Sequence, residues 1–153
     1  MTSREVEPKL IWEQFDDITR VPRPSKKEEK IIAWLKEFAV KHGFEHDTDA
    51  TGNVVIRKAA TAGYENRPTV ILQSHMDMVC EKRSDVEFDF DNDPIQTYID
   101  GEWVKAKGTT LGADCGIGMA AALAVLLDEE LEHPAIEALF TVDEETGLTG
   151  AFG

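Results

Sequence analysis

The stretch from Gly116 to Leu127 is almost uniformly apolar and rich in alanine, and it constrains the fold more than any other part of the chain. A helix that is apolar around most of its circumference has to be buried, and its small side chains allow it to pack closely against a sheet. Two further apolar runs, Thr69–Gln73 and Ile136–Val142, have the length of strands. Together these segments predict an α/β domain with a mixed β-sheet flanked by helices.

The other segments predict two N-terminal helices, two hairpins and an acidic loop. Apolar periodicity places the first helix at residues 8–18, and the capping-box spacing of Ser25-Lys-Lys-Glu28 starts a second helix that ends before Gly43. Residues 44–48 and 53–57 are expected to pair as strands, and the run at 69–74 is expected to be an interior strand. The remaining expectations are an acidic loop at 81–93, a hairpin at 98–104 turning at Asp100-Gly101, and a glycine-rich final loop at 146–153.

Charge and composition exclude several classes of function. The formal net charge of −14 argues against a surface for nucleic acid or anionic membranes, which would need clustered Lys and Arg. No apolar run approaches the roughly 18 residues that a membrane span needs, and the first residues lack the pattern of a signal peptide. Cys80 and Cys115 form neither a metal-binding spacing nor a disulfide framework. We therefore expect a cytoplasmic protein without nucleic-acid or membrane partners.

Side chains that can bind a metal ion or transfer a proton follow the apolar runs. His75 and Asp77 come directly after the first run, two residues apart, so that in extended structure they face the same side. A metal-bound imidazole usually donates its other N–H to a carboxylate, which suits this pair, although His-x-Asp pairs also occur as ordinary surface hydrogen bonds. Asp114 lies between glycines at the start of the long helix, where it could be an N-cap or could approach a ligand closely.

Glu144 and Glu145 follow the second apolar run. In extended structure adjacent side chains point to opposite sides, so we expect one carboxylate on a metal ion and the other free to take a proton from a water molecule. The alternative is a solvated acidic turn. Cys115 is expected to be a small buried residue, and the remaining histidines are expected at the surface, namely His42, His46 and His133.

Taken together and in this order, these clusters resemble the co-catalytic zinc peptidases of the aminopeptidase, carboxypeptidase and deacylase type. The resemblance spans almost the whole chain, and it extends to the aminoacyl-histidine (Xaa-His) dipeptidase subgroup. The segments that carry it are Pro22-Arg-Pro-Ser25, Gly52-Asn-Val-Val-Ile-Arg-Lys58, Gln73-Ser-His-Met-Asp-Met-Val79, the stretch 93–105 and Gly108-Thr-Thr-Leu-Gly-Ala-Asp-Cys-Gly-Ile-Gly-Met119.

The resemblance implies a role for each of the five residues. His75 would bind one zinc ion with Asp77 as its orienting partner, Asp114 would bridge two ions, Glu145 would bind the second ion, and Glu144 would be the general base. Manganese or cobalt could replace zinc in a carboxylate-rich site. In this family Asn or Asp follows the bridging Asp, at a cis peptide bond, whereas this chain has Cys115.

The family also has an Asp and a His ligand further along the chain, and a lid or dimerisation domain. Residues 1–153 are therefore expected to be the N-terminal portion of the catalytic domain, inactive alone, from an enzyme that forms homodimers. The sheet edge near residues 136–142 is expected to be unpaired or covered by another copy. The function expected is hydrolysis of short peptides, of the carnosine-like Xaa-His type. The alternatives are another peptidase or N-acyl amino acid deacylase of the family, or a non-catalytic relative.

Overall fold

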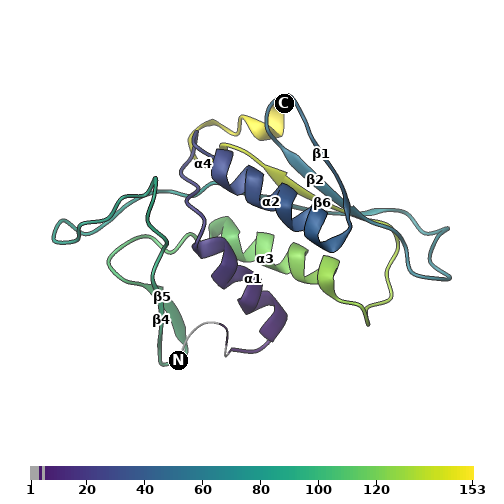
Figure 1. The fold of residues 1–153 in the computed structure, drawn as a ribbon, viewed down its shortest axis with the longest axis horizontal. Coiled ribbons are helices and arrows are strands. Elements are labelled where there is room, and N and C mark those ends of the chain that lie inside the picture. The colour runs from purple at the N-terminus through teal and green to yellow at the C-terminus, as the bar shows by residue number, and fades with distance from the viewer. Residues whose placement is uncertain (1–3, 5) are drawn as a thin grey trace.

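The computed structural model describes residue 4 and residues 6–153, which form a mixed sheet packed against helices (Figure 1). The elements in chain order are α1 (Lys9–Thr19), α2 (Glu29–His42), β1 (Glu45–Thr48), β2 (Val54–Lys58), β3 (Val70–His75), β4 (Thr97–Asp100), β5 (Trp103–Ala106), α3 (Ala113–Leu127), β6 (Ile136–Thr141), α4 (Glu144–Gly147) and the 3₁₀ helix η2 (Gly150–Phe152). The predicted α/β class with a mixed sheet is confirmed. Among the described residues, no helix is both long and apolar enough to cross a membrane.

The main sheet has the strand order β1-β2-β6-β3, and β4 and β5 form a separate hairpin. Strand β6 runs antiparallel to β2 and parallel to β3. In the parallel pair His75 lies opposite Thr141, so both strands end at the same edge of the sheet. The residues after β3 and the residues after β6 are thereby brought together, although more than sixty residues separate them in the sequence.

The helices pack on the face of the sheet that carries its buried side chains. Alternate residues of β2 and β6 point to this face, where Val54, Ile56, Ala138 and Phe140 are fully buried. Helix α2 contacts β1 and β2, α3 contacts β3 and β6, and α1 packs on α3, as Figure 1 shows. The apolar circumference of α3 is explained by this position, since α3 has the sheet on one side and α1 on the other.

Two expectations about the sheet are wrong. Strand β3 lies at the edge and not in the interior, and Val70 and Ile71 are exposed. Strand β6 is interior, so the segment expected to be an unpaired edge is paired on both sides. Short apolar runs show that a strand is buried on one face, but they do not indicate its neighbours, which long-range pairing decides.

Several local expectations also need correction. The second hairpin turns at Gly101-Glu102, one residue later than expected. Residues 146–153, expected to be a loop, contain the end of α4 and all of η2. Helix α2 has Glu28 at its N-cap position without a side-chain cap, because Ser25 hydrogen-bonds elsewhere. The expected Gly43 end of α2 is confirmed by its left-handed conformation, with φ of 73°. His133 is buried and not at the surface.

Candidate metal centre

His75 is the last residue of β3 and lies almost fully buried at the sheet edge. Its Nδ1 is 3.2 Å from Asp77 Oδ1, and its Nε2 is 3.0 Å from Asp114 Oδ1. The hydrogen bond to Asp77, helped by the one to Asp114, raises the pKa of His75 to about 9 although burial opposes the charge. In the absence of metal both ring nitrogens are therefore protonated near neutral pH, and each donates to a carboxylate.

Asp114 reaches His75 from the first turn of α3. The N-cap position of this helix is occupied by Gly112, and Asp114 itself has non-helical backbone angles. Its side chain is 87% exposed and makes no cap hydrogen bond. The N-cap alternative is therefore wrong. The peptide bond between Asp114 and Cys115 is cis, as the resemblance implies for this position.

Glu144 and Glu145 lie in the short helix α4, directly after Asp143, whose φ of 49° is left-handed. The expected extended geometry is wrong here, because a helical turn does not send adjacent side chains to opposite sides. Donor atoms of both glutamates and of His75 lie within 4.8 Å of one another. Glu144 Oε2 is 3.7 Å from His75 Nε2, which is beyond hydrogen-bond distance. Burial raises the pKa of Glu145.

Asp77 is completely buried and accepts hydrogen bonds on both carboxylate oxygens. Oδ1 accepts from His75 and from the backbone N–H of Glu144 at 3.0 Å. Oδ2 accepts from the Ser25 hydroxyl at 2.7 Å and from the N–H of Glu145 at 3.2 Å. Burial alone would raise the pKa of Asp77, but these donors hold it well below its usual range. Asp77 thus contacts both the histidine and the backbone of the two glutamates.

Arg23 connects the two segments that carry His75 and Asp114, and sequence reasoning gave it no role. Its guanidinium is buried and donates to the backbone carbonyls of Met76, at 3.1 Å, and Asp77, at 3.0 Å. It also donates to the carbonyl of Gly112 at 2.5 Å. Burial lowers the pKa of Arg23 to about 10, so it keeps its charge at neutral pH. The sequence signal for Arg23 was its place in Pro22-Arg-Pro-Ser25. Nothing in that segment indicates which backbone carbonyls, more than fifty residues away, accept its hydrogen bonds.

Two groups of side chains at this edge have the donor set of a metal centre. His75, Asp114 and Cys115 form one, and His75, Glu144 and Glu145 form the other, each with donor atoms within 4.8 Å of one another. Imidazole nitrogen with carboxylate oxygen suits zinc and similar divalent ions. The residues therefore fit such an ion. A third acidic group, Glu28 with Asp77 and Asp143, already accepts backbone and hydroxyl hydrogen bonds.

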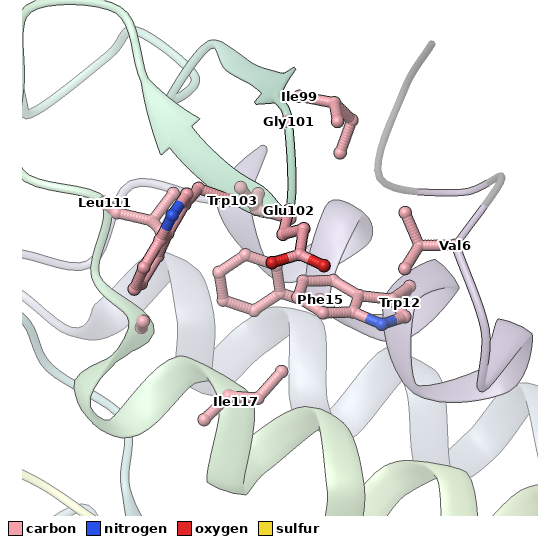
Figure 2. A pocket seen from close by; sticks show the side chains of 11 residues that line it. Val6, Trp12, Phe15, Ile99, Gly101, Glu102, Trp103, Leu111 and Ile117 are labelled. Carbon is pink, nitrogen blue, oxygen red and sulfur yellow. The ribbon is translucent and has the colours of Figure 1, made fainter.

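An apolar pocket lies elsewhere, between α1, the β4-β5 hairpin and the start of α3 (Figure 2). Its volume is about 450 Å³, and Figure 2 shows the rings of Trp12, Phe15 and Trp103 around it. None of the five residues singled out from the sequence lines this pocket. The carboxylate-rich sheet edge is thus the stronger candidate for chemistry, because it combines perturbed pKa values with convergent polar groups.

Comparison with known proteins finds a family match over the part of the chain that carries these five residues. The profile of peptidase family M20/M25/M40 matches residues 71–153. The cytosol non-specific dipeptidase of Escherichia coli is 53% identical over 149 residues, which are 97% of this chain and 31% of that protein. The crystal structure of aminoacylhistidine dipeptidase from Vibrio alginolyticus superposes with a TM-score of 0.97 at 53% identity, over 100% of this chain and 31% of that one. The crystal structure of aminopeptidase PepT from Bacillus cereus is also similar, with a TM-score of 0.74 at 26% identity, over 97% of this chain and 40% of that one. The chain thus spans about a third of the length of the first two relatives.

Proposed function

Because this chain belongs to peptidase family M20/M25/M40, we propose that its carboxylate-rich sheet edge is part of the active site of a metal-dependent dipeptidase. Residues 1–153 would be the N-terminal portion of the catalytic domain. The observation that carries the proposal is the convergence of His75, Asp114 and the glutamate pair at one edge. We place the enzyme in the cytoplasm, as the name of the Escherichia coli relative suggests for that protein, and propose that the intact enzyme is a homodimer.

In this proposal three residues hold two divalent ions, with zinc favoured and manganese or cobalt possible. His75 Nε2 would bind one ion after losing its proton, Asp114 would bridge, and Glu145 would bind the other. The short contact between His75 and Asp114 and the exposure of the Asp114 carboxylate support this assignment. When bound, such a pair of ions would polarise the scissile carbonyl and lower the pKa of water.

The remaining chemistry falls to Glu144 and Asp77. Glu144 would take a proton from the attacking water on its carboxylate and pass it to the departing amine. It is near His75 without being hydrogen-bonded to it, so its carboxylate is free for this transfer. Asp77 would keep the proton of His75 on Nδ1, which leaves the lone pair of Nε2 for the metal. The division of roles between Glu144 and Glu145 is the one that the resemblance to the co-catalytic zinc peptidases implies, because the extended geometry expected for this pair is absent.

The substrates proposed are dipeptides of the Xaa-His type. The name of the Vibrio protein specifies aminoacyl-histidine, whereas that of the Escherichia coli protein specifies only dipeptides. A tripeptidase, an N-acyl amino acid deacylase and a non-catalytic relative are the alternatives. Turnover of a panel that contains carnosine, other dipeptides, tripeptides and N-acyl amino acids by the complete gene product separates them. If the complete gene product hydrolyses none of these compounds in the presence of zinc, manganese or cobalt, the proposal is refuted.

The role of Glu144 is tested in the complete gene product. Glu144→Ala should keep its metal content and lose about 10²–10⁴-fold in turnover, which is the usual contribution of a general base. Glu137→Ala is a matched control, because Glu137 lies in β6 and pairs with Arg57 at 3.1 Å, on the sheet and away from His75. Loss of metal from Glu144→Ala, or near-normal turnover, would contradict the assignment.

We also propose that the chain of 153 residues is inactive by itself. A zinc ion normally needs about four ligands, one of which is water or substrate. Asp114, His75 and Glu145 provide one shared ligand and one further ligand for each ion. Assaying the purified chain with zinc and an Xaa-His dipeptide tests this, and robust chelator-sensitive turnover would show that further ligands are not required.

A further inference from the structure

The turn that carries the two glutamates is held by its backbone amides. The N–H groups of Asp143, Glu144 and Glu145 are consecutive, and each donates to a carboxylate from another part of the chain. Asp77 accepts the second and third of these bonds. The first goes to Glu28 Oε1 at 2.9 Å, across 115 residues of sequence. The orientation of the whole turn relative to β3 and α2 therefore depends on two buried side chains.

Glu28 is buried, with 6% of its surface exposed, at the residue before α2. The same Oε1 atom also accepts the N–H of Lys26 at 3.0 Å. Burial raises the pKa of Glu28, and the two amide donors oppose that shift. A buried carboxylate is costly unless its oxygens are hydrogen-bonded, so the bond to the Asp143 amide stabilises both partners.

We propose that Glu28 is a positioning residue that fixes the Asp143–Glu145 turn, and through it the carboxylates of Glu144 and Glu145 beside His75. The consequence for catalysis rests on the proposed function, but the hydrogen bond between Glu28 and the Asp143 amide does not depend on that function. Without Glu28 the Asp143 amide would lose its buried acceptor, and the left-handed backbone at Asp143 would lose a bond that holds it. Of the three amides, only the second and third would then keep a carboxylate acceptor, Asp77, while the bonds of the Asp143 carboxylate to Thr146 and Thr149 are local and do not tie the turn to β3 or α2.

A purely structural role for Glu28 is the competing explanation, and the packing of α2 argues against it. This helix is anchored by side chains that are buried in the core, namely Ile31, Leu35, Phe38 and Ala39. Glu28 makes no side-chain cap for the helix. Its bond to Asp143 leads away from α2, to the residues that follow β6. Removal of Glu28 should therefore disturb the turn locally and leave α2 in place.

Amide hydrogen exchange measured by NMR on the metal-free chain tests the contact directly. Glu28→Ala should speed exchange of the Asp143 amide at least about tenfold, while core amides such as that of Ile56 stay unchanged. Glu28→Gln keeps an oxygen that can accept the same bond, and it should exchange within about threefold of the wild type. Asp128→Ala is the matched control, because Asp128 accepts the amides of Glu130 and Leu131 in the turn that follows the C-terminal end of α3.

Three results would overturn the proposal. One is exchange of the Asp143 amide in Glu28→Ala within twofold of the wild type. Another is a uniform acceleration of core amides, which would indicate general loss of stability. The third is Glu28→Gln behaving like Glu28→Ala, since this would show that the hydrogen bond is not what holds the turn. Asp128→Ala should leave the amides of residues 143–145 unchanged.

Zinc affinity of the complete gene product, measured by calorimetry, gives the functional readout. Loss of a side chain that orients metal ligands typically costs 10–100-fold in affinity, so Glu28→Ala should bind zinc at least about tenfold more weakly than the wild type or Glu28→Gln. Equal affinities of Glu28→Ala and the wild type would overturn the link from Glu28 to the site. A complete wild-type gene product that binds no zinc would count against the proposed function, whereas amide exchange decides the role of Glu28 in either case.

Discussion

Replacing Asp77 by asparagine should destabilise this protein strongly, because its two carboxylate oxygens accept bonds from two different backbone amides. Oδ1 accepts the N–H of Glu144 and Oδ2 accepts the N–H of Glu145. An asparagine offers only one acceptor oxygen. In either orientation its NH₂ group would face one of these N–H donors, so one buried amide loses its acceptor.

The magnitude follows from two contributions. An orphaned buried N–H costs about 1–3 kcal/mol, and the bonds that remain lose their charge assistance, which lowers each from about 1.5–3 to about 1 kcal/mol. The free energy of unfolding should therefore fall by about 3 kcal/mol. For a chain of this size 1 kcal/mol corresponds to roughly 2–4 °C, so the Tm should drop by about 6–12 °C. Urea and thermal unfolding of the metal-free chain measure both quantities.

Asp49→Asn is the matched control. Asp49 accepts three backbone amides, those of Thr51, Gly52 and Asn53, but all three bonds go to the single oxygen Oδ1. Asparagine can keep that oxygen in place and loses only the bond that Oδ2 accepts from the Asn53 side-chain amide. Asp49 is exposed, so water can replace that bond and the cost should stay below about 1 kcal/mol. A loss for Asp77→Asn that is no larger than the loss for Asp49→Asn would refute the reasoning.

Two further predictions concern pH and the loop before Asp114. The pKa of His75 is raised to about 9 in the metal-free fold from about 6.5 in the unfolded chain. The contribution of protonated His75 to the stability of the fold is therefore complete below pH 6.5 and is lost as the pH rises to about 9. The free energy of unfolding should fall by at most about 3 kcal/mol over this range, reduced by solvent screening at exposed Asp114, and His75→Gln should remove this pH dependence in urea titrations. Gly112→Ala should destabilise more than Gly43→Ala in the same assay: both glycines have left-handed φ, but a Cβ on Gly112 would lie 2.5 Å from Arg23 Nη2, whereas one on Gly43 meets nothing within 4 Å. Equal losses would show that contact with the Arg23 guanidinium does not matter.

The errors in the sequence interpretation have one physical origin. The position of β3 at the sheet edge, the burial of His133 and the helical turn at Glu144 all depend on contacts with distant segments. Ser25 illustrates this point. Its spacing to Glu28 predicts a capping box, but its hydroxyl bonds to Asp77 instead. A local motif predicts a local hydrogen bond only when no better acceptor is brought close by the fold.

The sequence by itself determined the α/β class, the approximate limits of the main helices and strands, and the chemical identity of the residues at the ends of β3 and β6. These properties follow from apolar periodicity and local backbone preferences, which act over a few residues. Tertiary structure alone decided which side chains meet. The parallel register of β3 and β6 sets His75 beside Thr141, and the bonds from Arg23, Glu28 and Asp77 to backbone groups 53 to 115 residues away then orient the site. Such contacts depend on the packing of the whole domain, and no short segment of sequence encodes them.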